Sequence, residues 1–169
     1  MIRRTPNFRL RADPKKLQAA ALEVISGVGF KRARLEDIAR QVGVTKGAIY
    51  MHFASKEQLL DRVIETFCLP DIPAHAGPPE RMLETALGEG SAAKVLRIVI
   101  TEWVDLPDLG TRYLDAMVGK LSRWPGFKDA IEAQELAKKV LGGTLFSMLF
   151  MPGKFAPVPV SQDVGAIDA

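Results

Sequence analysis

The most constraining feature of this chain is the segment of residues 35–56, LEDIARQVGVTKGAIYMHFASK. In its first part, apolar side chains recur at positions i, i+3, i+4 and i+7, a spacing that predicts a short amphipathic helix with one buried face. These apolar residues are Leu35, Ile38, Ala39 and Val42. Gly43 can adopt the left-handed backbone that ends a helix, so we expect the helix to end there.

A second short helix is predicted directly after this turn. Thr45 can cap it, because a threonine hydroxyl accepts a hydrogen bond from an otherwise unpaired backbone N–H. Ile49 and Phe53, one turn apart, can anchor this helix on the core. Ser55 followed by Gln58 has the spacing of a capping box and predicts a further helix. Two short helices joined by a glycine turn are typical of the helix-turn-helix, whose second helix enters the major groove of DNA.

These residues also resemble a known family. GFKRARLEDIARQVGVTKGAIYMHFASKEQLL, with the preceding KLQAAALEVISGV, is similar to the N-terminal domain of the tetracycline-repressor (TetR/AcrR-like) family of bacterial regulators. The resemblance covers residues 17–63. It implies an all-α fold, in which a three-helix helix-turn-helix domain precedes a helical domain that binds a ligand and dimerises. It also implies a transcriptional regulator, in the first instance a repressor, that binds a near-palindromic operator as a homodimer and is released by a small hydrophobic ligand.

The resemblance implies roles in DNA binding for residues of the second short helix. Thr45 would cap this helix and contact a phosphate. Lys46, Gly47 and Ala48 would face the groove, since small residues allow the backbone to approach DNA closely.

Three residues after these would contact phosphates, again by resemblance to the family. Tyr50 and His52 match its aromatic and histidine contacts, and Lys56 would be assisted by the N-terminal dipole of the following helix. The alternative for Tyr50 is an ordinary half-buried aromatic residue. For His52 the alternative is a local hydrogen bond near the core.

The chain departs from the family pattern just before residue 35. Family members usually carry threonine or serine there, which caps the helix and touches a phosphate, whereas this chain has Ala33 and Arg34. Arginine caps a helix poorly, so the helix start can fray. A guanidinium can hold a phosphate through two donors, however, and we expect Arg34 to replace the lost contact.

Charge is distributed unevenly between the two domains predicted at residues 1–56 and 57–169. The first holds 12 Lys and Arg against 4 Asp and Glu, a net charge of +8, and the second holds 11 against 16, a net charge of −5. A basic helix-turn-helix half suits a polyanion such as DNA. The arginines of residues 1–12 form either a basic arm along the DNA or a solvated tail, and the sequence leaves both open.

The second half also has helical periodicity, with no convincing strand pattern. The prolines of residues 69–80, LPDIPAHAGPPE, predict a loop or interdomain joint. Helices are expected at residues 80–87, at 109–121 and at 128–150. Another is expected from Ser91, which can cap it, to the region of Trp103, which would lie on its broad apolar side. From Pro152 the chain is predicted to be extended or disordered.

The last predicted helix ends in VLGGTLFSMLFM, which is apolar on almost all sides. Its own chain could bury it, or it could pack against a second copy, with Gly142 and Gly143 permitting close contact. Because family members dimerise through their last helices, we expect a homodimer through this region.

Aromatic and methionine side chains of the second half could line an effector cavity of the kind the family implies. The candidates are Trp103, Tyr113, Met117, Phe127 and Phe146. Such a wall would suit a hydrophobic or aromatic ligand. The alternative for each residue is an ordinary place in the core.

Other classes of function have little support in the sequence. No paired carboxylates, Ser/His or Cys/His arrangement or phosphate loop appears, so we expect no enzyme, no catalytic residue and no cofactor. Cys68 and His75 alone are weak support for a metal site, and we expect none. No apolar run is long enough to span a bilayer, which predicts a cytoplasmic protein without membrane contact. The competing function is a ligand-independent DNA-binding or adaptor protein whose C-terminal half only dimerises.

Overall fold

The structure is a computed structural model that describes residues 12–70, 78–88, 90–124, 127 and 129–150, with side chains up to residue 144. Over these residues the only regular structure is helical, which confirms the predicted all-α fold. The helices are α1 (Pro14–Val28), α2 (Leu35–Val42), α3 (Lys46–Tyr50), α4 (Lys56–Phe67), α5 (Pro79–Gly88), α6 (Gly90–Glu102), α7 (Leu109–Leu121) and α8 (Ala130–Phe150). Most of the predicted basic arm, His75 and the tail from Pro152 lie outside the described residues.

The helices α1, α2 and α3 form the predicted three-helix unit. Asp13 caps α1 by accepting the backbone N–H of Lys15 at 2.9 Å. Gly43 ends α2 with φ of +77°, which is the left-handed conformation expected from the sequence. Ile38 and Ile49 are fully buried and join α2 and α3 to the core.

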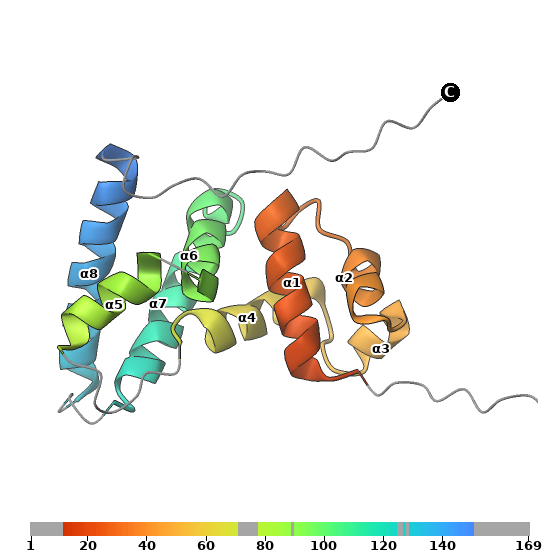
Figure 1. Ribbon diagram of the computed structural model, residues 1–169, viewed down its shortest axis with the longest axis horizontal. Helices are drawn as coiled ribbons and strands as arrows, with labels where there is room; N and C mark the ends of the chain where they lie inside the picture. The colour runs from red at the N-terminus through yellow and green to blue at the C-terminus, as the bar shows by residue number, and fades with distance from the viewer. Residues whose placement is uncertain (1–11, 71–77, 89, 125–126, 128, 151–169) are drawn as a thin grey trace, which may run out of the picture.

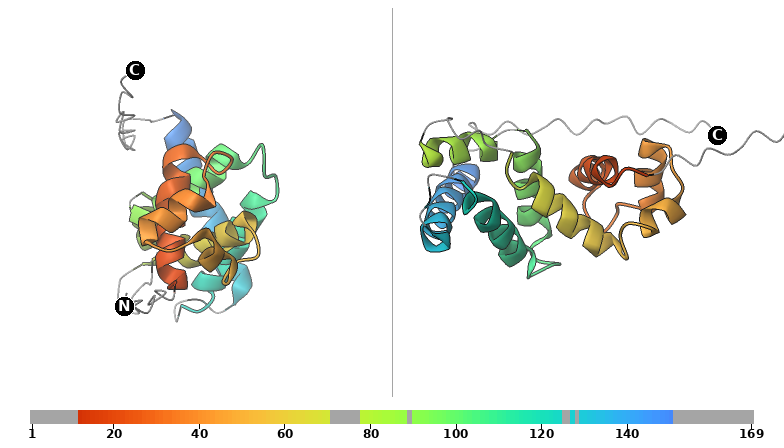
Figure 2. Two further views of the ribbon diagram at one scale, coloured as in Figure 1. Left: turned by 90° about the vertical axis from the view of Figure 1, so that its right-hand side faces the viewer. Right: turned by 90° about the horizontal axis from the view of Figure 1, so that it is seen from below.

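The helix α4 connects this unit to the remaining helices. Ser55 caps it by accepting the backbone N–H of Gln58 at 3.1 Å, as the capping box predicts. In Figure 1, α1, α2 and α3 lie at one end of an elongated molecule and α5 to α8 at the other, with α4 between them. The views of Figure 2 agree, and α4 packs against α1, α6 and α7. The predicted domain boundary after residue 56 coincides with the first residue of α4 and stays a prediction.

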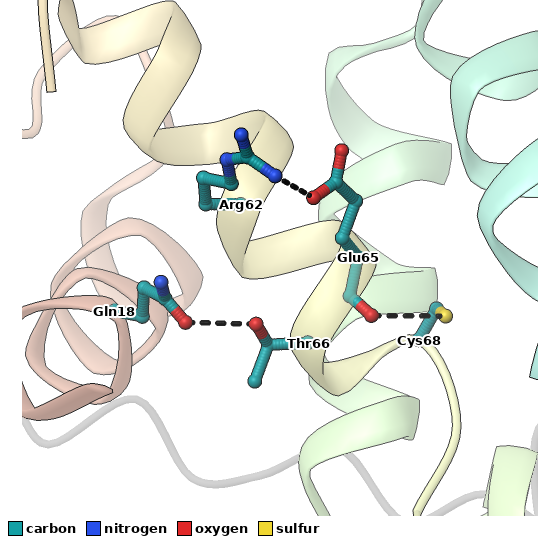
Figure 3. Close-up of polar contacts among 5 residues, drawn as sticks. All are labelled: Gln18, Arg62, Glu65, Thr66 and Cys68. Atoms are coloured by element: carbon teal, nitrogen blue, oxygen red, sulfur yellow. Dashed lines mark hydrogen bonds and ion pairs between the residues drawn. The ribbon is translucent and has the colours of Figure 1, made fainter. Parts of the chain in front are cut away.

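Polar contacts hold the C-terminal end of α4 in place. The hydroxyl of Thr66 donates to the amide oxygen of Gln18 in α1 at 2.8 Å (Figure 3). The ammonium of Lys120 in α7 donates to the carbonyl oxygens of Thr66 and Leu69, each at 2.6 Å. The positive charge of Lys120 is also stabilising at this position, because the C-terminal end of a helix is the negative end of its dipole. The end of α4 is therefore tied to both halves of the molecule.

Two expectations about α6 were wrong. This helix begins at Gly90, so Ser91 lies inside it and does not cap it. It ends at Glu102, and the following Trp103 is 61% exposed instead of lying on the buried side. The chain leaves the helix in a turn whose Leu106 N–H donates to the Glu102 carbonyl at 2.8 Å, and this turn carries the indole outward.

Two glycines of the N-terminal unit should respond oppositely to alanine. Gly43→Ala should lower the free energy of unfolding by about 1–2 kcal/mol, because a side chain destabilises the left-handed backbone. Gly27→Ala should raise it by about 0.5–1 kcal/mol, because Gly27 is helical and its added methyl group meets no neighbour within 4 Å. Urea unfolding of both variants measures the difference. Equal changes in the free energy of unfolding for the two variants would contradict a left-handed Gly43 and a helical Gly27.

Candidate nucleic-acid interface

The outer face of α3 is presented to solvent at the end of the molecule far from α8 (Figure 1). Thr45, Lys46, Gly47, Tyr50 and His52 are all exposed. Thr45 caps α3 by accepting the backbone N–H of Ala48 at 3.3 Å, which confirms the predicted cap. The structure therefore leaves these five candidates accessible, with Lys46 beside Tyr50 and Gly47 beside Thr45.

Lys46 already has an anionic partner in the free protein. Its ammonium lies 2.7 Å from a carboxylate oxygen of Glu36 in α2, and 5.9 Å from the centroid of the Tyr50 ring. The hydrogen bond from Lys46 lowers the pKa of the Glu36 carboxyl, and the same contact raises the pKa of the Lys46 ammonium. Both groups stay charged at neutral pH, so a phosphate would compete with Glu36 for Lys46.

The glycine at position 47 is not required by the packing of the chain itself. A Cβ built on Gly47 would meet only the hydroxyl oxygen of Thr45, at an ordinary distance of 3.8 Å. The absence of a side chain instead leaves the backbone of α3 open to close approach from outside. Ala48, in contrast, is half-buried and packs against the core, so less of its surface is available to a groove.

The end of α3 presents aromatic and apolar surface. Tyr50 is 49% exposed and Met51 is 83% exposed. The exposed ring of His52 lies beside that of the buried Phe53, with 6.2 Å between the centroids. The backbone N–H of His52 donates to the carbonyl of Ile49 at 2.9 Å. Roles for Tyr50 and His52 at phosphates therefore stay predictions on an accessible surface.

Arg34 occupies the N-cap position of α2 without making a side-chain cap. This agrees with the expectation that arginine caps poorly. Its side chain is exposed. Its phosphate contact stays a prediction.

Lys56 is placed differently from the other candidates. Its ammonium donates to the carbonyl oxygens of Phe30 at 2.8 Å, Ala33 at 3.2 Å and Lys31 at 3.5 Å. It also lies 4.4 Å from the centroid of the Phe30 ring. All three donor hydrogens thus have partners inside the chain. A phosphate contact by Lys56 would require it to give up some of these bonds.

The residues predicted to line an apolar effector cavity lie in different surroundings in the described part of the chain. Tyr113 and Met117 are buried in the core, and Phe127 is half-buried with its ring 6.1 Å from that of Trp124. Trp103 points to solvent, and the side chain of Phe146 lies outside the described ones. The burial of Tyr113 and Met117 agrees with the core alternative, and a role of these residues at a cavity stays a prediction.

A polar cavity lies between α4 and α7 instead. It has a volume of about 640 Å³. Its lining consists of Asp61, Ile64, Glu65, Thr66, Arg112, Asp115, Ala116, Gly119, Lys120 and Arg123. Arg112 and Asp61 form an ion pair across it. This cavity could not be predicted from the sequence, because its residues are spread over two helices without a recognisable spacing.

A metal-binding cluster or a reactive cysteine among the described residues would point to another function. No group of three or more His, Cys, Asp or Glu side chains is placed there to hold a metal ion. Burial raises the pKa of the Cys68 thiol to about 11, so this thiol is protonated at neutral pH. Across the same part of the chain, none of the helices has the length and apolar character needed to cross a membrane.

Comparison with known proteins identifies the N-terminal unit. A family model for "Bacterial regulatory proteins, tetR family" matches residues 17–63, which contain most of α1, all of α2 and α3 and much of α4. This part of the chain is therefore a TetR-type helix-turn-helix domain, similar to that of bacterial transcriptional regulators.

Individual relatives share mainly this unit. The HTH-type transcriptional regulator SrpR of Pseudomonas putida is 49% identical over 45 residues, 27% of this chain and 21% of that protein. The fatty acid metabolism regulator protein of Bacillus subtilis (strain 168) is 33% identical over 95 residues, 55% of this chain and 45% of that protein. The matched segments thus span less than half of either regulator's own length.

A solved structure extends the likeness to the fold of the C-terminal half. SmeT, the repressor of the Stenotrophomonas maltophilia multidrug efflux pump SmeDEF, matches with a TM-score of 0.53 and 22% identity. The match covers 86% of this chain and 82% of SmeT. This confirms a helix-turn-helix unit followed by a helical C-terminal domain as the fold.

Changing the acidic partner of Lys46 should alter DNA binding by this chain. Glu36→Gln should tighten binding by about two- to fivefold, because it removes a carboxylate that repels phosphates and competes for Lys46. Lys46→Ala should weaken binding and make the slope of log K against log salt shallower by about 0.9. Fluorescence anisotropy with labelled duplex DNA measures both.

A matched control is Glu80→Gln, which removes the carboxylate of the Lys139–Glu80 ion pair between α8 and α5, at the opposite end of the molecule from α3 (Figure 1). It should leave DNA affinity and salt slope unchanged. Equal effects of Glu36→Gln and Glu80→Gln would contradict the placement of DNA on α3.

Proposed function

We propose that this regulator is a repressor that binds a near-palindromic operator as a homodimer and is released by a small ligand. The observation that carries the proposal is the exposed face of α3, with a lysine, an open glycine backbone and a tyrosine side by side. Lysine supplies charge for phosphates, the glycine allows close approach, and tyrosine offers both an apolar ring and a hydroxyl. SmeT, which has the same fold, is itself a repressor.

The outer position of α8 supports the dimer. This helix lies at the edge of the molecule opposite the helix-turn-helix and packs on α5 and α7 (Figure 1). Gly142 and Gly143 are exposed, and a Cβ built on either would meet no atom within 4 Å. A second copy could therefore approach this face closely, as the predicted homodimer requires. Two-fold symmetry would then give two α3 helices for two operator half-sites.

The cavity between α4 and α7 is the place that we propose for the effector. It adjoins the helix that connects the two halves, and Lys120 both lines it and holds the end of α4. Its lining favours a ligand that has polar or charged groups beside an apolar part, which adds polar groups to the hydrophobic or aromatic ligand expected from the sequence. A ligand shifts operator binding only by its different affinities for the two conformations.

Selection of genome fragments by the purified chain tests the operator proposal. We expect enrichment of a short near-palindrome whose half-sites are about 10 base pairs apart, centre to centre, or somewhat more. A variant with Lys46→Ala and Tyr50→Ala should melt normally and enrich no motif. Binding without any sequence preference by the unaltered chain would contradict the operator proposal.

Two glycines of α7 allow a matched test of the effector cavity. Gly119 lines the cavity and Gly110 does not, and a Cβ built on either would meet no atom within 4 Å. A panel of aromatic, aliphatic and carboxylate compounds should contain some that raise the melting temperature of the unaltered chain. Gly119→Leu should abolish that rise by filling the cavity, whereas Gly110→Leu should preserve it.

The same panel separates a ligand-responsive repressor from the competing adaptor. If no compound changes the melting temperature, the ligand-independent reading is favoured. If Gly119→Leu and Gly110→Leu respond alike to an active compound, its site lies elsewhere and the assigned cavity is wrong.

A further inference from the structure

The turn between α1 and α2, residues 29–33, is held by two charged side chains from different parts of the fold. Glu102, the last residue of α6, accepts the backbone N–H of Phe30 at 2.9 Å. Lys56, the first residue of α4, donates to the carbonyl oxygen of the same Phe30 at 2.8 Å. The backbone N–H of Phe30 thus donates to a carboxylate, and its C=O accepts from an ammonium.

The position of Glu102 is unfavourable for stability alone. The residue is only 8% exposed, and burial of a carboxylate carries a desolvation cost. It also lies at the C-terminal end of α6, where the helix dipole disfavours negative charge. An apolar residue would avoid both costs. A specific role in holding the turn would explain why a carboxylate is present.

Gly29 leaves space for this carboxylate. Its φ is +83°, and a Cβ built on it would lie 2.9 Å from the Oε1 atom of Glu102. A non-glycine residue would therefore meet both backbone strain and a steric conflict with the carboxylate. The backbone of the turn and the side chain of Glu102 fit each other closely.

The turn determines where the DNA-binding helices begin. It leads directly into Arg34, the N-cap of α2, and α2 has no side-chain cap of its own. Lys56 also donates to the carbonyl oxygen of Ala33 at 3.2 Å, immediately before Arg34. The start of α2 is thus placed by contacts with the turn, and α3 follows α2 after a short connection. A change in α6 can reach both helices through the Glu102–Phe30 contact.

The geometry points to Glu102 as a positioning residue for DNA binding: through the N–H of Phe30 it links α6 to the placement of α2 and α3. Glu102 touches no DNA in this arrangement. Its action depends on the turn, with Lys56 holding the other side of the same residue. The inference rests on the DNA-binding role of the helix-turn-helix and adds a route by which the C-terminal half influences it.

Two other ion pairs connect the same regions and provide comparisons. Lys94 of α6 lies 2.6 Å from Glu23 of α1, away from the turn. Lys31 in the turn lies 2.6 Å from Asp105, but both side chains are largely exposed. Exposed pairs contribute little. Lys94→Ala is therefore the matched control, because it breaks a link between α6 and α1 without touching Phe30.

The test combines DNA titrations at several salt concentrations with thermal melting of the full chain. Glu102→Ala should weaken binding about tenfold, because it removes a hydrogen bond to a charged group. The slope of log K against log salt should stay unchanged, since no phosphate contact is lost. Arg34→Ala, in contrast, should make the slope shallower by about 0.9. Glu102→Gln should stay within about threefold of the unaltered chain, because its amide oxygen still accepts the Phe30 N–H.

Several results would overturn the proposal. A folded Glu102→Ala variant that binds DNA as tightly as the unaltered chain would show that the Glu102–Phe30 contact does not position α2 and α3. An equal loss of DNA affinity in Lys94→Ala would show that binding depends on any link between α6 and α1, and not specifically on the Glu102–Phe30 contact. If Glu102→Ala does not fold, Glu102→Asp is used instead, since it keeps the charge and withdraws the oxygen by one methylene. Binding by Glu102→Asp equal to that of the unaltered chain would contradict the proposal in the same way.

The titrations use two duplexes, a selected fragment and one of unrelated sequence. Failure of the unaltered chain to prefer the selected fragment would contradict the operator proposal alone. Unchanged binding of the Glu102 variants on both duplexes would contradict the role of Glu102 alone.

Discussion

The arrangement of the two halves depends on how α4 is held at both of its ends by lysine ammonium groups. At its start, Lys56 binds carbonyl oxygens of the turn between α1 and α2. At its end, Lys120 binds the carbonyl oxygens of Thr66 and Leu69. Ammonium groups suit this task because one group can satisfy several backbone acceptors at once. These charge-assisted hydrogen bonds add to the apolar core shared by both halves in positioning the DNA-binding unit relative to α5–α8.

The proposed function places DNA binding and ligand control in different parts of the molecule. The face formed by Lys46, Gly47 and Tyr50 belongs to α3, at one end of the molecule (Figure 1), and the cavity beside Lys120 lies between α4 and α7. Coupling between such sites requires an element with two arrangements that both sites influence. The helix α4 packs on α1 and also lines the cavity, so it is the element through which we expect such coupling, and the Glu102–Phe30 contact offers a second connection, through α6. Lys46 is paired with Glu36 in the free protein. Binding of DNA would therefore exchange the Glu36 carboxylate for a phosphate as the partner of Lys46.

The fold was largely predictable from the sequence, because its helices carry strong local signals. Gly43, Thr45 and Ser55 lie where the predicted turn and caps require them. The resemblance over residues 17–63 then supplied the family and the candidate residues. Less predictable were contacts between distant residues. Nothing in the spacing of Lys56 and Phe30 shows that one binds the other, and the aromatic residues of the C-terminal half gave no means to distinguish a cavity wall from a core. The polar cavity between α4 and α7 was missed for the same reason.

The most direct test of the account is hydrogen–deuterium exchange of the full chain with and without a selected DNA duplex. The account predicts slower exchange in peptides that cover residues 34–52, where α2 and α3 would meet DNA. It predicts no comparable change in α8, which lies at the opposite end of the molecule. Protection confined to other helices, with residues 34–52 exchanging as in the free protein, would contradict the assignment of this face to DNA.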